Sequence, residues 1–120
     1  MQEIVERYID SWNALDAARR RELIDGLWAA DGRYTDPVAD VQGRDQIDAT
    51  IGAVQQQFPG LVFTLGGAVD ANHRQARFSW HLGPASGGEP VVIGFDVLVV
   101  DGDGLIRTVH GFLDKVPAAA

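Results

Sequence analysis

Three residues that lie far apart in the sequence have side chains suited to proton transfer: Tyr8, Asp36 and Asp96. Each falls where its neighbours along the chain predict the apolar face of a helix or strand. A phenol and two carboxyl groups that meet inside an apolar pocket would hold an oxyanion and move a proton. The sequence therefore predicts a pocket with acid–base chemistry, and the surrounding elements decide whether the three groups can meet.

Asp96 interrupts a strand that is apolar on both faces, with 91–95 before it and 97–100 after it. An ionised carboxylate without a partner is costly to bury, so this group must pair or stay protonated. A neutral Asp96 would donate a hydrogen bond to a ligand oxygen. The alternatives are a salt bridge to a helix arginine and an edge position that faces water.

The other two groups each allow a functional and a structural interpretation. Tyr8 shares a helix face with Ile4 and Trp12, because residues four apart are neighbours on a helix. Its hydroxyl would donate to a carbonyl or enolate oxygen, or it would lie at the rim as part of a core tyrosine. Asp36 shares one side of a short strand with Tyr34 and precedes a proline. Its carboxylate would remove a proton next to a carbonyl, or it would cap a turn.

Hydrophobic periodicity predicts three helices followed by a series of strands. The helical stretches are 2 to about 14, a second that starts after Asp16 and ends at Asp31-Gly32, and a third from Gly43 to Pro59-Gly60. A short extended piece at 33–36 separates the last two helices. The period then changes to that of strands, at 61–70, 75–83, 91–101 and 105–113. The turn-rich connectors between these strands predict an antiparallel meander.

This order of elements predicts an α+β fold, with a single domain over residues 1–116 and a frayed tail at 117–120. Three helices that cover one face of a strongly bent sheet form a cone, which leaves a cavity near its wide end. Trp28 and Phe78 are expected to fill the core rather than line the cavity. The side chains predicted to contact a ligand are those of Trp12, Tyr34, Phe58, Trp80 and His110.

The composition argues against several classes of function. A formal charge of -7 repels phosphate backbones, so nucleic-acid binding is not expected. The chain has no cysteine, its histidines lack metal-ligand spacing, and the loop 101–104 lacks the downstream glutamate of a calcium site, so no metal is expected. No stretch approaches the roughly 20 apolar residues of a membrane span, and the first residues do not resemble a signal peptide. We therefore expect a cytoplasmic protein with no membrane partner.

Four segments, taken in their order, resemble the nuclear transport factor 2-like superfold and specifically its SnoaL-like branch. They are Tyr8–Asn13, Leu27–Asp31, Tyr34–Val38, and Asp96 with the later 103–106. Within that superfold the pattern is most similar to that of ketosteroid isomerases. The resemblance implies that Tyr8 and a protonated Asp96 form an oxyanion hole, that Asp36 is the general base, and that no cofactor or metal is needed.

The sequence thus predicts a protein that binds a hydrophobic, carbonyl-bearing small molecule and performs isomerase-like acid–base chemistry. Two other functions stay open for the same fold: a polyketide cyclase or hydrolase, and a non-catalytic module for ligand binding or association. His110 is an alternative base, because imidazoles exchange protons near neutral pH. Valine and leucine on both faces of 91–100 also predict a homodimer that packs sheet against sheet.

Overall fold

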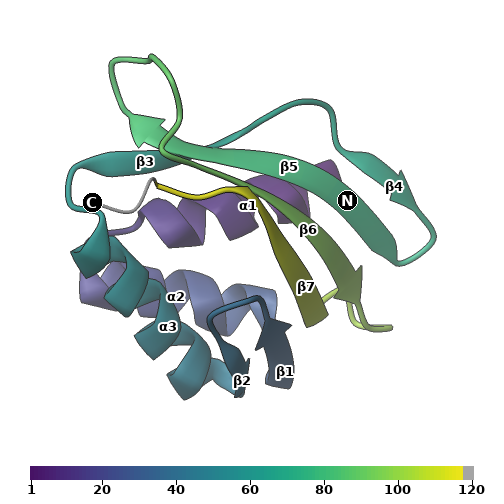
Figure 1. Ribbon diagram of the computed structural model, residues 1–120. Helices are drawn as coiled ribbons and strands as arrows, with labels where there is room; N and C mark the ends of the chain where they lie inside the picture. Colours follow the sequence, from purple (N-terminus) through teal and green to yellow (C-terminus); the bar gives the residue numbers. More distant parts are fainter. Residues whose placement is uncertain (118–120) are drawn as a thin grey trace.

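The computed structural model describes residues 1–117, in which three helices pack against one side of a curved sheet (Figure 1). The tail that is expected to fray is 117–120, and its last three residues, 118–120, lie outside the described residues. The helices are α1 (Gln2–Asn13), α2 (Ala17–Leu27) and α3 (Arg44–Gln57). The strands are β1 (Trp28–Thr35), β2 (Asp40–Gln42), β3 (Leu61–Leu65), β4 (Asp70–Asn72), β5 (Gln75–Pro84), β6 (Val92–Val100) and β7 (Ile106–Lys115).

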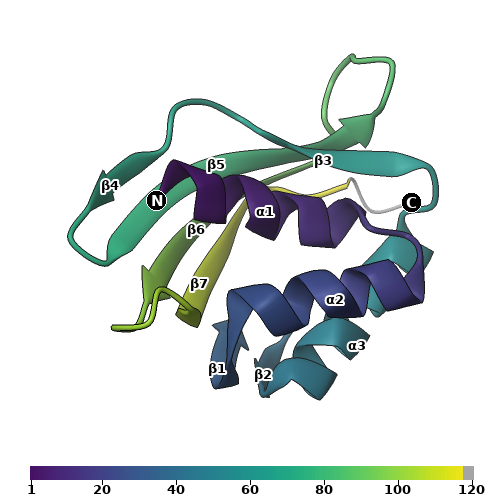
Figure 2. The ribbon, with the colours of Figure 1, turned by 180° about the vertical axis from the view of Figure 1, so that it is seen from behind.

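The strands form one sheet in the order β2-β1-β7-β6-β5-β3, and β4 pairs with β5 at its edge. The predicted antiparallel meander is present, since β3 pairs with β5, β5 with β6 and β6 with β7, all antiparallel, whereas β1 lies parallel to β7. The sheet bends around the helices in both opposite views (Figures 1 and 2). The predicted α+β cone is therefore confirmed. None of the helices in the described part of the chain has the length and apolar character that a membrane crossing requires.

α1 carries the first group of interest into the concave side of the sheet. Its apolar residues recur at helical spacing, so one face of the helix is buried and includes Tyr8 and Trp12. The helix ends at Asn13, whose side chain fastens it to β3. The Asn13 amide donates to the Phe63 carbonyl oxygen at 2.8 Å, and its own oxygen accepts the Phe63 N–H at 2.8 Å. This double hydrogen bond fixes the position of α1 relative to the sheet.

The boundary between α2 and β1 differs from the prediction. Asp16 caps α2 as expected, since its carboxylate accepts the N–H of Arg19 at 2.9 Å. The helix ends at Leu27, however, and not at Asp31. Trp28 is already extended and pairs with Ile106 of β7, while its ring is fully buried. Pairing with β7 and burial of a large ring both favour the strand here, and they outweigh the helical spacing.

The elements after β2 match the prediction with one further difference. α3 begins after Gly43, whose backbone has a φ of +91° that favours glycine. The strand predicted at 61–70 ends at Leu65 as β3, and β4 occupies 70–72, where a turn-rich connector is predicted; both strands pair with β5. They are separated near Gly66, where a Cβ would lie 2.7 Å from the His81 ring. The close passage of the backbone over this ring interrupts the strand.

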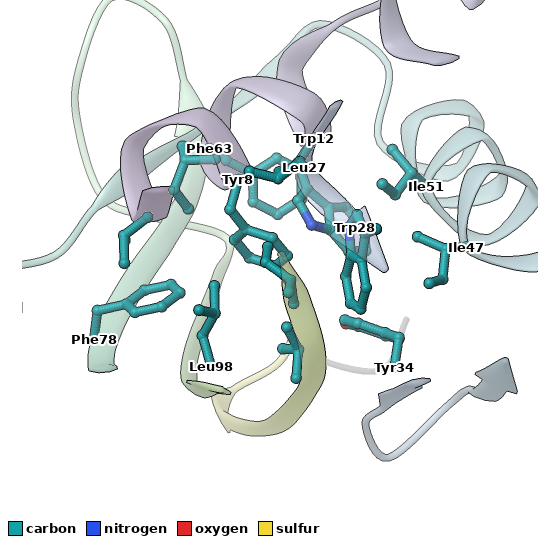
Figure 3. Packing of buried hydrophobic residues seen from close by; sticks show 14 of the residues in the cluster. Tyr8, Trp12, Leu27, Trp28, Tyr34, Ile47, Ile51, Phe63, Phe78 and Leu98 are labelled. Carbon is teal, nitrogen blue, oxygen red and sulfur yellow. The ribbon is translucent and has the colours of Figure 1, made fainter. Parts of the chain in front are cut away.

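The core fills the space between the helices and the sheet (Figure 3). The ring of Tyr8 lies between Phe78 and Leu98 on the sheet side and Trp28 on the other. Trp28 and Phe78 are core residues, as the sequence predicts, and neither lines the cavity described below. Packing on every side of Tyr8 leaves its ring little freedom, so the position of its hydroxyl is well defined.

Candidate active site

A cavity of about 270 Å³ lies between α1, β1, the end of α3 and the concave side of the sheet. Its wall is mainly apolar and aromatic, which is typical of a small-molecule site. Among the described residues that line it, none is lysine, arginine or histidine, and two are carboxylic acids. The lining residues are Tyr8, Ile9, Trp12, Tyr34, Asp36, Val38, Val54, Gln57, Phe58, Phe63, Trp80, Leu82, Val92, Asp96, Leu113, Val116 and Pro117.

Asp96 lies at the buried end of this cavity and contacts Tyr8. Only 3 % of Asp96 is exposed, and the Tyr8 hydroxyl donates to its Oδ2 at 3.2 Å. Burial raises the pKa of Asp96 to about 7, against the opposing effects of the Trp80 indole N–H and the Tyr8 hydroxyl, and the Asp36 charge raises it further. Neither structural alternative applies, because the group does not face water and no arginine of residues 1–117 pairs with it. A large fraction of Asp96 is therefore protonated at neutral pH.

Tyr8 is held by packing and by this one hydrogen bond. Its ring centroid lies 5.9 Å from that of Phe78 and 6.4 Å from those of Trp12 and Trp28. Burial and the Asp96 charge raise the pKa of the Tyr8 phenol well above 10.0. The hydroxyl therefore keeps its proton and can act as a hydrogen-bond donor to an oxygen in the cavity.

Asp36 lies in the turn after β1, and its carboxylate accepts three hydrogen bonds. The Tyr34 hydroxyl donates to its Oδ2 at 2.5 Å, and the backbone N–H groups of Val38 and Ala39 donate to its Oδ1, each at 2.8 Å. Oδ1 of Asp36 therefore caps the turn, as the structural alternative predicts. The other oxygen faces Tyr34, and both of these side chains line the cavity. Burial and the charges of Asp96 and Asp36 raise the pKa of Tyr34 well above its usual 10.0, so Tyr34 is the donor in this pair.

A glycine on β7 allows the two carboxyl groups to approach each other. Gly111 pairs directly with Asp96 across the sheet, and a Cβ there would lie 2.9 Å from Asp96 Oδ1 and 3.1 Å from the Asp36 Cβ. Any side chain at this position would push both acids away. Glycine within a strand often marks such a close approach.

A second glycine makes room for an indole ring beside Asp96. Gly94 of β6 pairs with Trp80 of β5, and a Cβ on Gly94 would lie 2.1 Å from the Trp80 ring. The ring therefore lies flat over the strand, with its N–H close enough to Asp96 to lower the pKa of that acid. Trp80 also contacts Phe63 at 5.3 Å between centroids, which closes the wall on this side.

Four of the five residues predicted to contact a ligand line the cavity, and His110 does not. Trp12, Tyr34, Phe58 and Trp80 are lining residues. His110 is exposed on the convex face, because Gly111 next to it points inward and successive residues of a strand alternate. The expectation that His110 reaches the cavity, and with it the alternative base, is wrong.

Sequence reasoning missed several lining residues and both spacing glycines. Leu82, Val92 and Leu113 have the same strand parity as Trp80, Asp96 and Gly111, so the alternation itself contained the signal. The glycines were also visible, as interruptions within apolar strands. Within residues 1–117, metal-binding side chains do not gather in groups of three or more.

The comparisons with known proteins agree on the fold. A model of the SnoaL-like domain matches residues 5–109. A protein from Agrobacterium tumefaciens, described as a candidate isomerase of the SnoaL-like family, is 39% identical, with 95% of this chain and 97% of that chain covered and a TM-score of 0.89. A candidate SnoaL-like polyketide cyclase from Jannaschia sp. CCS1 is 21% identical over 93% and 83% of the two chains, with a TM-score of 0.75.

A third similar structure has no stated function. It is a SnoaL-like protein from Burkholderia thailandensis, 17% identical, with 95% of this chain and 94% of that chain covered and a TM-score of 0.73. Two others, from Silicibacter pomeroyi and Methylobium petroleophilum, are described as having a cystatin-like fold. No curated protein matches the chain. At these lower identities the likeness concerns the fold alone.

Proposed function

Because the chain belongs to the SnoaL-like family, we propose that its cavity binds a hydrophobic carbonyl compound and catalyses a cofactor-free, isomerase-type proton shift. The observation that carries the proposal is the buried Tyr8–Asp96 pair beside Asp36, in a cavity that is otherwise mainly apolar. Two hydrogen-bond donors and one acceptor of protons are the groups that enolisation of a ketone requires. Fold alone would not justify this function, since the same architecture supports several.

The donors would bind the carbonyl oxygen of the substrate. The Tyr8 hydroxyl and the protonated form of Asp96 each offer one hydrogen bond, and both lie away from bulk water. As the α-proton leaves, negative charge develops on that oxygen, and hydrogen bonds to it become stronger than in the ground state. Since the pKa of Asp96 is about 7, this donor is progressively lost above neutral pH.

Asp36 would act as the base. Its carboxylate takes the α-proton of a β,γ-unsaturated ketone, the C–H electron pair forms the dienolate, and the same carboxyl group returns the proton to the γ-carbon. Atoms and electrons balance without an oxidant or a cofactor. The three hydrogen bonds to Asp36 keep its side chain in one orientation at the cavity wall.

The size of the cavity restricts the substrate. Its volume of about 270 Å³ lies slightly below the usual range for ligand sites, which is roughly 300–1,000 Å³. We therefore propose substrates of one or two rings. The exposed Val38 and Val116 contribute apolar surface to the lining as well, so a short hydrophobic substituent would be tolerated at this boundary.

The test replaces Asp36 with Asn and measures isomerisation of 3-cyclohexen-1-one and a bicyclic β,γ-unsaturated ketone by the ultraviolet absorbance of the conjugated product. The amide oxygen of Asn can still cap the turn, so the local backbone is retained. We expect turnover to fall about 100-fold or more, because general-base catalysis typically contributes that much. Unchanged turnover would remove Asp36 as the base.

Asp101→Asn is a matched control. Asp101 also caps a turn with its side chain, since its Oδ1 accepts the N–H groups of Asp103 at 2.9 Å and Leu105 at 3.1 Å. It lies in the β6–β7 connection and does not line the cavity. The same chemical change at this position is expected to leave turnover within about twofold.

Non-catalytic ligand binding is the second candidate, and the hydrogen bonds of Asp36 favour it. A carboxylate that already accepts three hydrogen bonds has a structural role in its turn and fewer free lone pairs for a proton. This function predicts that the ketones bind without any turnover. Binding measured by tryptophan fluorescence, together with no product, would favour this candidate over the isomerase.

A further inference from the structure

Within residues 1–117, two tryptophan N–H groups are buried without a hydrogen-bond acceptor. They are Nε1 of Trp12 and Nε1 of Trp28. Buried donors are paired in the great majority of cases, so each exception calls for an explanation. The two differ in one respect: Trp12 lines the cavity, whereas Trp28 belongs to the core and does not.

Trp12 lies next to the predicted oxygen-binding groups. It follows Tyr8 by one turn of α1, and the two ring centroids are 6.4 Å apart. Its indole N–H lies near enough to the Tyr8 hydroxyl to lower the pKa of that phenol against the stronger effect of burial, but within residues 1–117 it forms no hydrogen bond. Figure 3 shows Trp12 beside Tyr8, and its ring centroid lies 5.6 Å from that of Tyr34.

The orientation of Trp12 is fixed, so its N–H cannot turn to another acceptor. Trp12 is 7 % exposed, and its ring packs against Tyr34 and Phe63, with centroids at 5.6 Å and 5.4 Å. Its backbone carbonyl accepts a hydrogen bond from the Gln55 amide at 3.0 Å, which ties this end of α1 to α3. The donor is therefore preorganised and unused.

We propose that the Trp12 indole N–H is a third donor to the ligand oxygen that Tyr8 and Asp96 bind, and that it selects ligands with an oxygen at this position over hydrocarbons of the same shape. The inference rests on the proposed function only in that a carbonyl compound occupies the cavity. The inference adds Trp12 to the binding site, and the Trp12 ring and its N–H affect ligand binding separately. The ring contributes apolar contact to any ligand, while the N–H contributes only when an acceptor lies within reach.

The test compares β-tetralone with tetralin, which share a bicyclic skeleton and differ by one carbonyl oxygen. The chain has three tryptophans, so a proton–nitrogen correlation spectrum of the labelled protein contains three indole N–H signals. They are assigned with Trp→Phe variants. We expect β-tetralone to shift the Trp12 proton downfield, as hydrogen bonding does, and tetralin to leave it nearly unchanged. An equal response of this signal to both compounds would overturn the proposal.

Affinity gives a second, independent measurement. In Trp12→Phe, the ratio of the tetralin Kd to the β-tetralone Kd is expected to fall about five- to tenfold, since one hydrogen bond is lost. Trp28→Phe removes the other unpaired N–H from a position outside the cavity, so that ratio is expected to stay within about twofold. Use of the ratio cancels general effects of the smaller ring on cavity shape. If Trp12→Phe does not fold, the spectra of the unaltered protein still decide the question.

The outcomes separate this inference from the proposed function. If both compounds bind with equal affinity and the Trp12 signal does not distinguish them, the inference fails while an apolar binding site stands. If neither compound binds, both the inference and the proposed function fail. If β-tetralone binds through Trp12 but no ketone turns over, the inference stands and the isomerase proposal fails.

Discussion

The Asp96→Asn variant should gain stability relative to the natural protein as the pH rises. Asp96 is buried, contacts the Tyr8 hydroxyl, and has a pKa raised from 3.8 to about 7, chiefly by burial. The folded protein therefore holds a proton on this group at pH values where the unfolded chain has released it. Asn has a similar shape and cannot ionise, so the substitution removes the pH-dependent contribution of Asp96 to the free energy of unfolding.

The sign and size follow from that difference in pKa. A raised carboxyl pKa stabilises the fold at low pH relative to high pH, and this contribution is lost between about pH 4 and pH 7. The rise of the Asp96 pKa from 3.8 to about 7 corresponds to roughly 4 kcal/mol in total. Of this total, about 3 kcal/mol is lost between pH 5 and pH 9. The unfolding free energy of the Asn variant relative to the natural protein should rise by that amount.

The measurement is chemical denaturation of both proteins at several pH values from 5 to 9. Effects of other titrating groups are shared and cancel in the difference between the two curves. The difference should change most steeply between pH 5 and 7 and level off above pH 7. A difference that does not depend on pH would show that Asp96 is ionised throughout, and the neutral-donor mechanism would then be refuted.

Three further predictions concern other parts of the same structure. Gly111→Ala should lower turnover about tenfold or more, because the added Cβ displaces Asp96. Gly67→Ala should leave turnover unchanged, because a Cβ there meets no described atom within 4 Å. Steady-state kinetics of the two variants tests this. Tyr8→Phe should lower kcat about 100-fold. Because the Tyr8 hydroxyl lowers the pKa of Asp96, its loss should also move the decline of activity at high pH to a higher pH. A pH–rate profile tests this, and an unshifted decline would contradict it. In light scattering at micromolar concentration, the natural protein should be a dimer and the Phe112→Glu variant a monomer, since 57 % of Phe112 is exposed beside an apolar strand. A monomeric natural protein would rule out the sheet-to-sheet contact.

Much of the fold was predictable because local patterns and tertiary packing agree in most elements. The buried face of α1, the cap at Asp16 and the strands of the meander all follow from spacing and turn residues. Trp28 shows where the pattern misleads. Its position extends the apolar spacing of α2, and only the partner strand β7, which is distant in the sequence, makes it a strand residue. Such long-range pairing has no local signal.

The candidate site was predictable in its residues but not in its contacts. Burial of Asp96 follows from the apolar strand around it, since a carboxyl group there has few other environments. The hydrogen bond from Tyr34 to Asp36 and the approach of two acids over Gly111 depend on register between β1, β6 and β7. His110 illustrates the same dependence: a β-strand register shifted by one residue would have pointed it inward.

The two acids differ because the strands place them in different surroundings, although they lie close together. Asp96 is in the middle of β6 on the concave side, so it loses contact with water; among residues 1–117, the Tyr8 hydroxyl donates to it and the Trp80 indole N–H lies nearby. Asp36 is in the turn after β1, is partly exposed and receives three hydrogen bonds. The negative charge of Asp36 raises the pKa of Asp96 further, so the proton stays on the buried acid. The backbone thus sets the difference between the two acids before any ligand binds, and Gly111 is the position at which this arrangement can be disturbed without changing either acid.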